Sequence, residues 1–221
     1  MPLPEAVLFD LDGTLIDTAP DFIFVVNRML DEEGKAPLPD QLIRNTVSNG
    51  AKALVTLAFN INEDHQDFLN YRQRLLDLYS EHLAVKSHLF QGMDLLLSTL
   101  EASGIPWGIV TNKPEQYAEP LISALALGER CSVLICPDHV QHTKPDPEPL
   151  FKACNKLNTK PVNSIYVGDH LRDIQAGQNA MMKTIVALFG YISPDDDPLL
   201  WGADFAAIDP PELTDIIFNN F

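Results

Sequence analysis

Residues 6–14 read Ala6-Val7-Leu8-Phe9-Asp10-Leu11-Asp12-Gly13-Thr14. The first four residues form an uninterrupted apolar run, which is typical of a parallel strand that is buried on both faces. The run ends abruptly at two aspartates separated by one residue and followed by glycine. A buried strand that leads into an acidic loop predicts a ligand site, because open α/β sheets bind their ligands at the carboxyl ends of the strands.

Five further apolar runs follow, at residues 107–110, 133–136, 164–167, 184–188 and, more weakly, 205–208. Most of them are separated by stretches with apolar residues at helical spacing, near residues 95–100, 117–125, 150–157 and 174–180. In the first of these stretches, Leu95, Leu96, Thr99 and Leu100 form the predicted buried stripe. Strands that alternate with helices predict an α/β fold with a Rossmann-like parallel sheet and right-handed crossovers.

One interval interrupts the alternation. Between Thr14 and about Phe90 we find no convincing strand, and apolar residues recur at helical spacing near residues 22–30, 54–58 and 68–79. We therefore expect an α-helical cap inserted after the first strand. The predicted domains are an α/β core of residues 1–16 and 86–221 and a helical cap domain of residues 17–85.

The composition excludes several classes of partner. The chain is 46% hydrophobic, which is enough for a full core. It has 15 basic and 31 acidic side chains and a formal net charge of -16. We expect no nucleic-acid or membrane partner, because both depend on cationic contacts. A metal ion or a few lysines in a cleft can still attract a small anionic substrate.

Three cysteines, Cys131, Cys136 and Cys154, have no CxxC spacing, which argues against a disulfide framework and a zinc site. The first residues contain no basic region, and their apolar run is too short for a signal peptide or a membrane span. These features predict a reduced, cytoplasmic protein. We expect a monomer or a weak homodimer.

Four polar clusters follow four of the predicted strands. In the first, Asp10 and Asp12 offer a nucleophile and a separate acid/base, the division of labour that paired carboxylates support. A structural turn rich in Asp and Gly is the alternative interpretation. In the second, Thr111 and Asn112 can donate hydrogen bonds to phosphate oxygens, although such residues also cap turns.

The third cluster is Lys144 in a proline-rich segment, where it can place a positive charge beside a phosphoryl group. An exposed surface lysine is the common alternative. In the fourth, Asp169 and Asp173 suit a hard divalent cation, unless they only cap a helix. His170 is a candidate acid or base, although a helix-start role fits it as well. The four clusters together form a set of groups suited to phosphoryl transfer.

At these clusters the sequence resembles the haloacid dehalogenase superfamily, in its phosphatase branch with a helical cap. Within that branch it resembles the phosphoglycolate phosphatase group and, most closely, the bacterial N-acetylmuramic acid 6-phosphate phosphatases of peptidoglycan recycling. The resemblance covers essentially the whole chain. Besides the four clusters, it is carried by residues 17–22 (DTAPDF), 111–114 (TNKP), 134–140 (LICPDHV), 190–192 (GYI) and 201–204 (WGAD).

The resemblance implies a magnesium-dependent hydrolase that forms an aspartyl-phosphate intermediate. It implies that Asp10 attacks phosphorus, and that Asp12 protonates the leaving oxygen and later activates water. The implied phosphate ligands are Thr111, Asn112 and Lys144. The implied Mg²⁺ ligands are Asp10, Asp169 and the backbone carbonyl of Asp12, with Asp173 in support.

Specificity depends on the cap, where Arg44, Asn49 and Lys52 are candidates for contact with the leaving group. A solvated helix face is the alternative for all three. We expect a small phosphate ester as substrate, with N-acetylmuramic acid 6-phosphate first and phosphoglycolate second. A β-phosphoglucomutase-like isomerase would share all four clusters and stays open. A dehalogenase is disfavoured because it has no need of Asp12.

Overall fold

The computed structural model describes residues 3–220, and a six-stranded parallel sheet forms its centre. The strand order is β5-β4-β1-β6-β7-β8. The strands are β1 (Ala6–Phe9), β4 (Trp107–Val110), β5 (Val133–Ile135), β6 (Ser164–Gly168), β7 (Lys183–Ala187) and β8 (Phe205–Ala207). In the middle of the sheet, Phe9 of β1 lies in register with Ile109 of β4 and Val167 of β6. The predicted α/β class with a Rossmann-like parallel sheet is confirmed.

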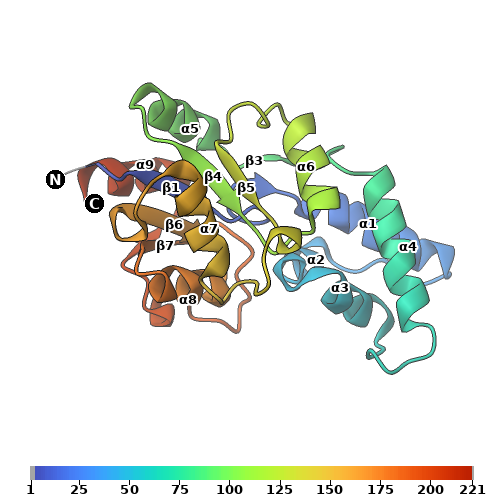
Figure 1. The fold of residues 1–221 in the computed structure, drawn as a ribbon. Helices are drawn as coiled ribbons and strands as arrows, with labels where there is room; N and C mark the ends of the chain where they lie inside the picture. Colours follow the sequence, from blue (N-terminus) through green and yellow to red (C-terminus); the bar gives the residue numbers. More distant parts are fainter. Residues whose placement is uncertain (1–2, 221) are drawn as a thin grey trace.

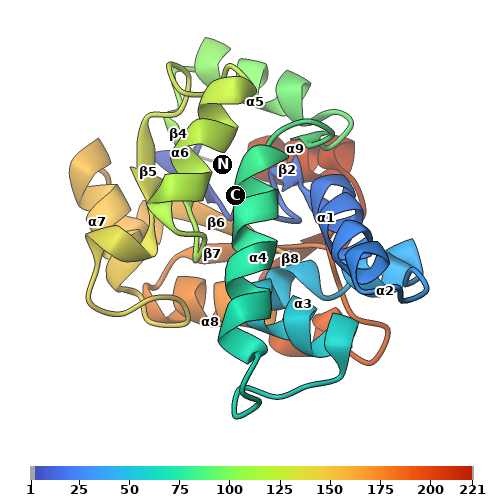
Figure 2. The ribbon, with the colours of Figure 1, turned by 90° about the vertical axis from the view of Figure 1, so that its right-hand side faces the viewer.

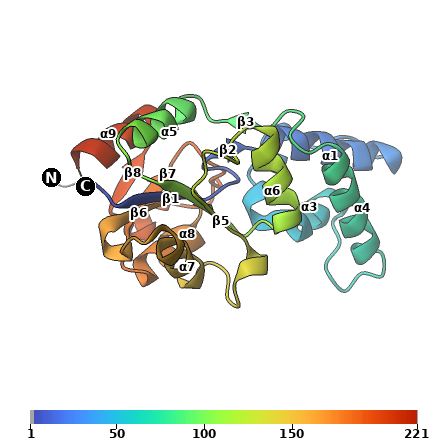
Figure 3. The same ribbon diagram turned by 45° about the horizontal axis from the view of Figure 1, so that its top comes forward.

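Helices cover both faces of this sheet (Figures 1 and 3). One face carries α5 (Met93–Ala102) and α9 (Pro210–Asn219), and the other carries α7 (Glu148–Leu157) and α8 (Leu171–Asn179). The side chains of β1 alternate between the two layers, with Val7 and Phe9 in the first and Leu8 in the second. Because both faces are covered, β1 contains no polar residue.

Four helices are inserted between β1 and the rest of the sheet. We call them the helical cap: α1 (Ala19–Glu32), α2 (Asp40–Arg44), α3 (Gly50–Phe59) and α4 (Phe68–Glu81). They lie beyond the carboxyl ends of the strands and face the viewer in Figure 2. They share an apolar core that includes Phe22, Val26, Leu75 and Tyr79. Only α2 has no counterpart among the predicted helices.

Two short strands flank the helical cap. β2 (Ile16–Asp17) pairs antiparallel with β3 (His88–Leu89), so the chain enters and leaves the helical cap through one ladder. The prediction of no strand between Thr14 and about Phe90 was therefore wrong, because a two-residue strand leaves no periodic pattern. One predicted domain boundary, between Ile16 and Asp17, falls inside β2, and the other falls two residues before β3. The division into two domains stays a prediction.

Within residues 3–220, we find no helix with the length and apolarity needed to span a membrane.

Candidate active site

The four polar clusters meet at the carboxyl edge of the sheet. Asp10 follows β1, Asp169 follows β6, and Lys144 lies in the loop after β5. The Nζ atom of Lys144 lies 2.8 Å from Asp10 Oδ1 and 2.7 Å from Asp173 Oδ1. One carboxylate oxygen from each of Asp10, Asp169 and Asp173 lies within 4.8 Å of the other two. Residues from distant parts of the sequence thus form one buried charged centre.

Lys144 is fixed in this centre by its neighbours. Its ammonium group donates hydrogen bonds to the carbonyl oxygen of Val110 (3.1 Å) and to the hydroxyl of Tyr166 (2.8 Å). The backbone of Lys144 donates to Asn112 Oδ1 and accepts from Asn112 Nδ2, at 3.2 and 3.1 Å. Asn112 therefore positions the lysine, which the sequence did not predict. Its predicted contact with phosphate stays a prediction.

The charged centre controls which carboxylates are ionised. Burial raises the pKa of Asp10, but the neighbouring Lys144 ammonium outweighs burial and holds that pKa below its usual value. For Asp173, burial outweighs Lys144 and the pKa is raised. Burial, together with the charges of Asp10 and Asp173, raises the pKa of Asp169 to about 7. Asp10 is thus an ionised carboxylate in a site with excess negative charge.

This excess negative charge suits a divalent cation. Asp10 Oδ1 is buried and accepts no hydrogen bond within residues 3–220, since its contact with Lys144 is an ion pair without hydrogen-bond geometry. Asp169 is held in place by Thr14 Oγ1, which donates to Oδ1 at 2.8 Å, and by the backbone N–H of Tyr191, which donates to Oδ2 at 2.9 Å. Carboxylate oxygens of this kind are the ligands that hard cations prefer. The residues present therefore fit a divalent metal ion.

Gly13 allows the acidic loop to approach Asp169. Its φ of +86° lies in the left-handed region, and an added Cβ would lie 2.3 Å from Asp169 Oδ2. No larger side chain fits there without displacing the carboxylate. The glycine that follows the two aspartates is thus a requirement of the charged centre.

Asp12 lies beside the charged centre and has its own basic partner. Its Oδ1 accepts a hydrogen bond from Thr18 Oγ1 at 2.6 Å and lies 2.9 Å from Lys113 Nζ. Both hydrogen bonds to its side chain within the described part of the chain are to Oδ1, so Oδ2 is available to exchange a proton with a ligand. Lys113 Nζ lies 4.7 Å from the ring centroid of Tyr79. Sequence reasoning assigned no role to Lys113.

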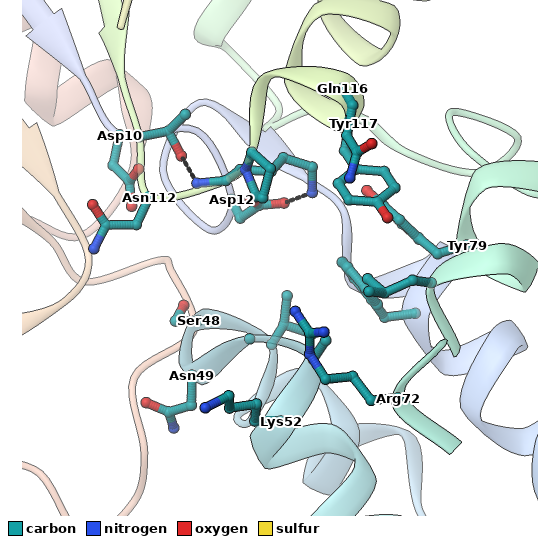
Figure 4. Close-up of a pocket in the computed structure, with 18 of the residues that line it drawn as sticks. Asp10, Asp12, Ser48, Asn49, Lys52, Arg72, Tyr79, Asn112, Gln116 and Tyr117 are labelled. Carbon is teal, nitrogen blue, oxygen red and sulfur yellow. Dashed lines mark hydrogen bonds and ion pairs between the residues drawn. The ribbon is translucent and has the colours of Figure 1, made fainter. Parts of the chain in front are cut away.

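A cavity of about 420 Å³ opens in front of Asp10 and Asp12 (Figure 4). The sheet side contributes Asp10, Asp12, Thr111, Asn112 and Lys113 to its lining, and α6 (Glu115–Ala124) adds Gln116 and Tyr117. The helical cap and its connecting segments contribute, among others, Ser48, Asn49, Lys52, Arg72 and Tyr79. A ligand with its phosphate at Asp10 would thus present its remaining atoms to the helical cap.

The three predicted specificity residues have different positions. Asn49 and Lys52 line the cavity, and their contact with a substrate stays a prediction. Arg44 lies outside the lining, and its predicted contact with a substrate stays a prediction. Its guanidinium donates to Asp17 Oδ2 at 2.6 Å and lies 5.3 Å from the ring centroid of Tyr191. The buried Asp17 neutralises this charge away from the cavity.

His170 occupies the start of α8. Its Nδ1 accepts a hydrogen bond from the backbone N–H of Arg172 at 3.3 Å. Burial, with the nearby Arg172 charge, lowers the pKa of His170 to about 4. The imidazole is therefore neutral and, by accepting this hydrogen bond, caps the N-terminus of α8, as the helix-start interpretation expects.

Comparison of the sequence with protein families gives the same class of protein as the geometry of this site. The family model described as "Haloacid dehalogenase-like hydrolase" matches residues 7–187. The chain therefore belongs to the haloacid dehalogenase-like hydrolase family, and it is a phosphatase. The resemblance inferred from the four clusters is confirmed.

Individual relatives show which phosphatases the chain is similar to. The chain is 47% identical to an N-acetylmuramic acid 6-phosphate phosphatase of Pseudomonas aeruginosa, over 96% of this chain and 94% of that protein. It is 41% identical to a phosphoglycolate phosphatase of Xanthomonas campestris, over 96% of each chain. The crystal structure of a predicted phosphoglycolate phosphatase from Haemophilus somnus superposes with a TM-score of 0.86 at 25% identity, over 98% of this chain and 99% of that one.

Proposed function

We propose that this phosphatase hydrolyses N-acetylmuramic acid 6-phosphate with Mg²⁺, through an aspartyl-phosphate intermediate on Asp10. The observation that carries the proposal is the ionised Asp10 beside Lys144, at one end of a cavity whose other wall comes from the helical cap. The names of the relatives at 47% and 48% identity support this choice of substrate.

The residues divide the reaction into two steps. A carboxylate oxygen of Asp10 attacks phosphorus while the bond to the ester oxygen breaks, and Asp12 gives that oxygen a proton. Asp12 then accepts a proton from the water that attacks the aspartyl phosphate, which releases phosphate and restores Asp10. Lys144 and Thr111 neutralise and orient the phosphoryl oxygens in both steps.

Mg²⁺ is the proposed metal, held by Asp10, Asp169 and the backbone carbonyl of Asp12, with Asp173 in support. It would supply positive charge that offsets the repulsion between an anionic nucleophile and an anionic phosphate. A cluster of carboxylates favours Mg²⁺ over softer metals, because hard cations prefer oxygen ligands.

Phosphoglycolate is the second candidate substrate, because relatives at 41% identity carry that name. The cavity of about 420 Å³ favours the much larger amino sugar.

The ranking is tested by measuring steady-state phosphate release from these two esters and from glucose 6-phosphate and ribose 5-phosphate, each with Mg²⁺ or EDTA. We expect N-acetylmuramic acid 6-phosphate to have the highest kcat/KM. A lead of about 100-fold for phosphoglycolate, worth about 2.7 kcal/mol, would overturn the ranking. Isomerised hexose phosphate in place of free phosphate would indicate a mutase.

We also propose a cytoplasmic protein that acts in peptidoglycan recycling. The free thiols of Cys131, Cys136 and Cys154 support a reducing compartment. Cell fractionation with an antibody to the chain tests this localisation, and recovery outside the cytoplasmic fraction would contradict it.

A further inference from the structure

Arg72 of α4 is a cation inside the cavity without a counter-charge. It reaches into the cavity on the side opposite Asp10 (Figure 4). Its Nε atom is buried and has no hydrogen-bond partner, and its guanidinium forms no ion pair within residues 3–220. Four other arginines pair with carboxylates: Arg28, Arg44, Arg74 and Arg130. In a chain of net charge -16, an arginine without an acidic partner is informative.

The other basic side chains that line the cavity already have partners. Lys52 pairs with Glu63 at 2.6 Å, and Lys113 pairs with Asp12 at 2.9 Å. Arg172 donates to the backbone carbonyl of Ser48. Arg172 also has no acidic partner and its Nε is unpaired, but it keeps the bond to Ser48, whereas Arg72 makes no hydrogen bond or ion pair within residues 3–220. Such a group costs free energy when it is shielded from water, unless a ligand supplies an acceptor.

We propose that Arg72 binds a carboxylate group on the substrate's leaving group. The inference rests on the proposed function, which places the phosphate at Asp10. An ester that spans the cavity then brings its far end to Arg72. The planar guanidinium matches a carboxylate with two parallel hydrogen bonds. The substrate class is therefore a phosphate monoester that carries a carboxylate as its second anionic group.

Both substrates named for the relatives belong to this class. N-acetylmuramic acid 6-phosphate has a lactyl carboxylate, and phosphoglycolate has the carboxylate of glycolate. N-acetylglucosamine 6-phosphate is the same amino sugar without the lactyl group. It would leave Arg72 unpaired, and sites built around a charged contact reject analogues that lack it.

The test compares Arg72→Gln with Arg74→Gln. Arg74 lies two residues along the same helix, is exposed and pairs with Glu32. For each variant, kcat/KM is measured with N-acetylmuramic acid 6-phosphate and with N-acetylglucosamine 6-phosphate. We expect Arg72→Gln to lower the ratio of the two values by about 30- to 100-fold, as for a charge-assisted contact shielded from water. In Arg74→Gln the ratio should stay within about twofold of wild type, because exposed ion pairs contribute little.

Two results would overturn the inference: an unchanged ratio in Arg72→Gln, or an equal loss with both sugars. Failure of the wild-type protein to release phosphate from either sugar or from p-nitrophenyl phosphate would instead refute the proposed function. A binding measurement keeps the two failures separate. Calorimetry with N-acetylmuramic acid 6-phosphate on Asp10→Asn should show affinity weakened about 30-fold by adding Arg72→Gln, and equal affinities would contradict the role of Arg72.

Discussion

Lys144→Met isolates the electrostatic role of the buried lysine. The Lys144 side chain is fully buried, and its Nζ lies 2.8 Å from Asp10 and 2.7 Å from Asp173. Methionine keeps most of the apolar stem and removes the charge, so both carboxylates stay buried without their counter-charge. Removal of one partner of a buried ion pair costs about 3–5 kcal/mol. We expect the free energy of unfolding to fall by that amount, with a midpoint of thermal unfolding lowered by about 10 °C.

The effect should depend on pH. Lys144 lowers the pKa values of Asp10 and Asp173, so both values rise when the lysine is removed. A carboxyl group whose pKa is higher in the folded than in the unfolded protein binds more protons in the folded protein. Its stabilising contribution is present below the unfolded pKa of about 4 and is lost as the pH rises through the folded pKa. The deficit of Lys144→Met should therefore grow between about pH 5.5 and pH 8.

Urea unfolding in EDTA at these two pH values, followed by circular dichroism, measures the deficit. Lys183→Met is the matched control, because Lys183 lies 2.7 Å from Asp204 but is 51% exposed. The control should lose less than about 1 kcal/mol. Equal losses in the two variants, or a deficit independent of pH, would refute the reasoning. In Mg²⁺, kcat/KM of Lys144→Met should be about 1,000-fold below wild type, because Lys144 faces the developing charge.

Three further outcomes are expected. Asp12→Asn should lower kcat about 100- to 1,000-fold with a sugar phosphate. The rate of formation of the intermediate from p-nitrophenyl phosphate should fall much less, because this leaving group needs no proton. Equal losses in the two rates would contradict the role of Asp12 as an acid. Gly13→Ala should cost about 3 kcal/mol in a urea titration and impair activity, because its Cβ would collide with Asp169; wild-type stability would disprove the close approach. EDTA should lower kcat at least about 100-fold and excess Mg²⁺ should restore it; activity that persists after chelation would exclude a metal role.

The sheet could be predicted because strands buried on both faces leave uninterrupted apolar runs, such as residues 6–9 and 107–110. The buried face of α5 was less predictable. Its predicted stripe included Leu95, which is 73% exposed, whereas Leu96, Leu97 and Leu100 are buried. Three consecutive leucines allow two neighbouring stripes, and only packing against α9 selects one of them. The two-residue strands β2 and β3 are too short to show any periodicity.

The charged centre could be predicted because parallel strands end at one edge of a sheet. Asp10 and Asp169 directly follow strands, Lys144 lies in the loop after β5, and Asp173 lies in the first turn of the helix that follows β6. The residues that form the cavity wall in the helical cap could not be predicted. Arg44 and Arg72 are the same residue type on two helices of the helical cap, and no local pattern separates them. Asp17 decides the difference, because it neutralises Arg44 and leaves Arg72 without an acidic partner. The role of Lys113 depends in the same way on the position of Asp12 in space.

Direct detection of the covalent intermediate tests the central claim. Asp12→Asn with p-nitrophenyl phosphate should form the aspartyl phosphate and hydrolyse it slowly, because Asp12 is needed to activate water. Acid quenching and peptide mass spectrometry should then find one phosphoryl group on the peptide that contains Asp10. A phosphoryl group on another residue, or p-nitrophenol release with Asp10 unmodified throughout, would contradict the account.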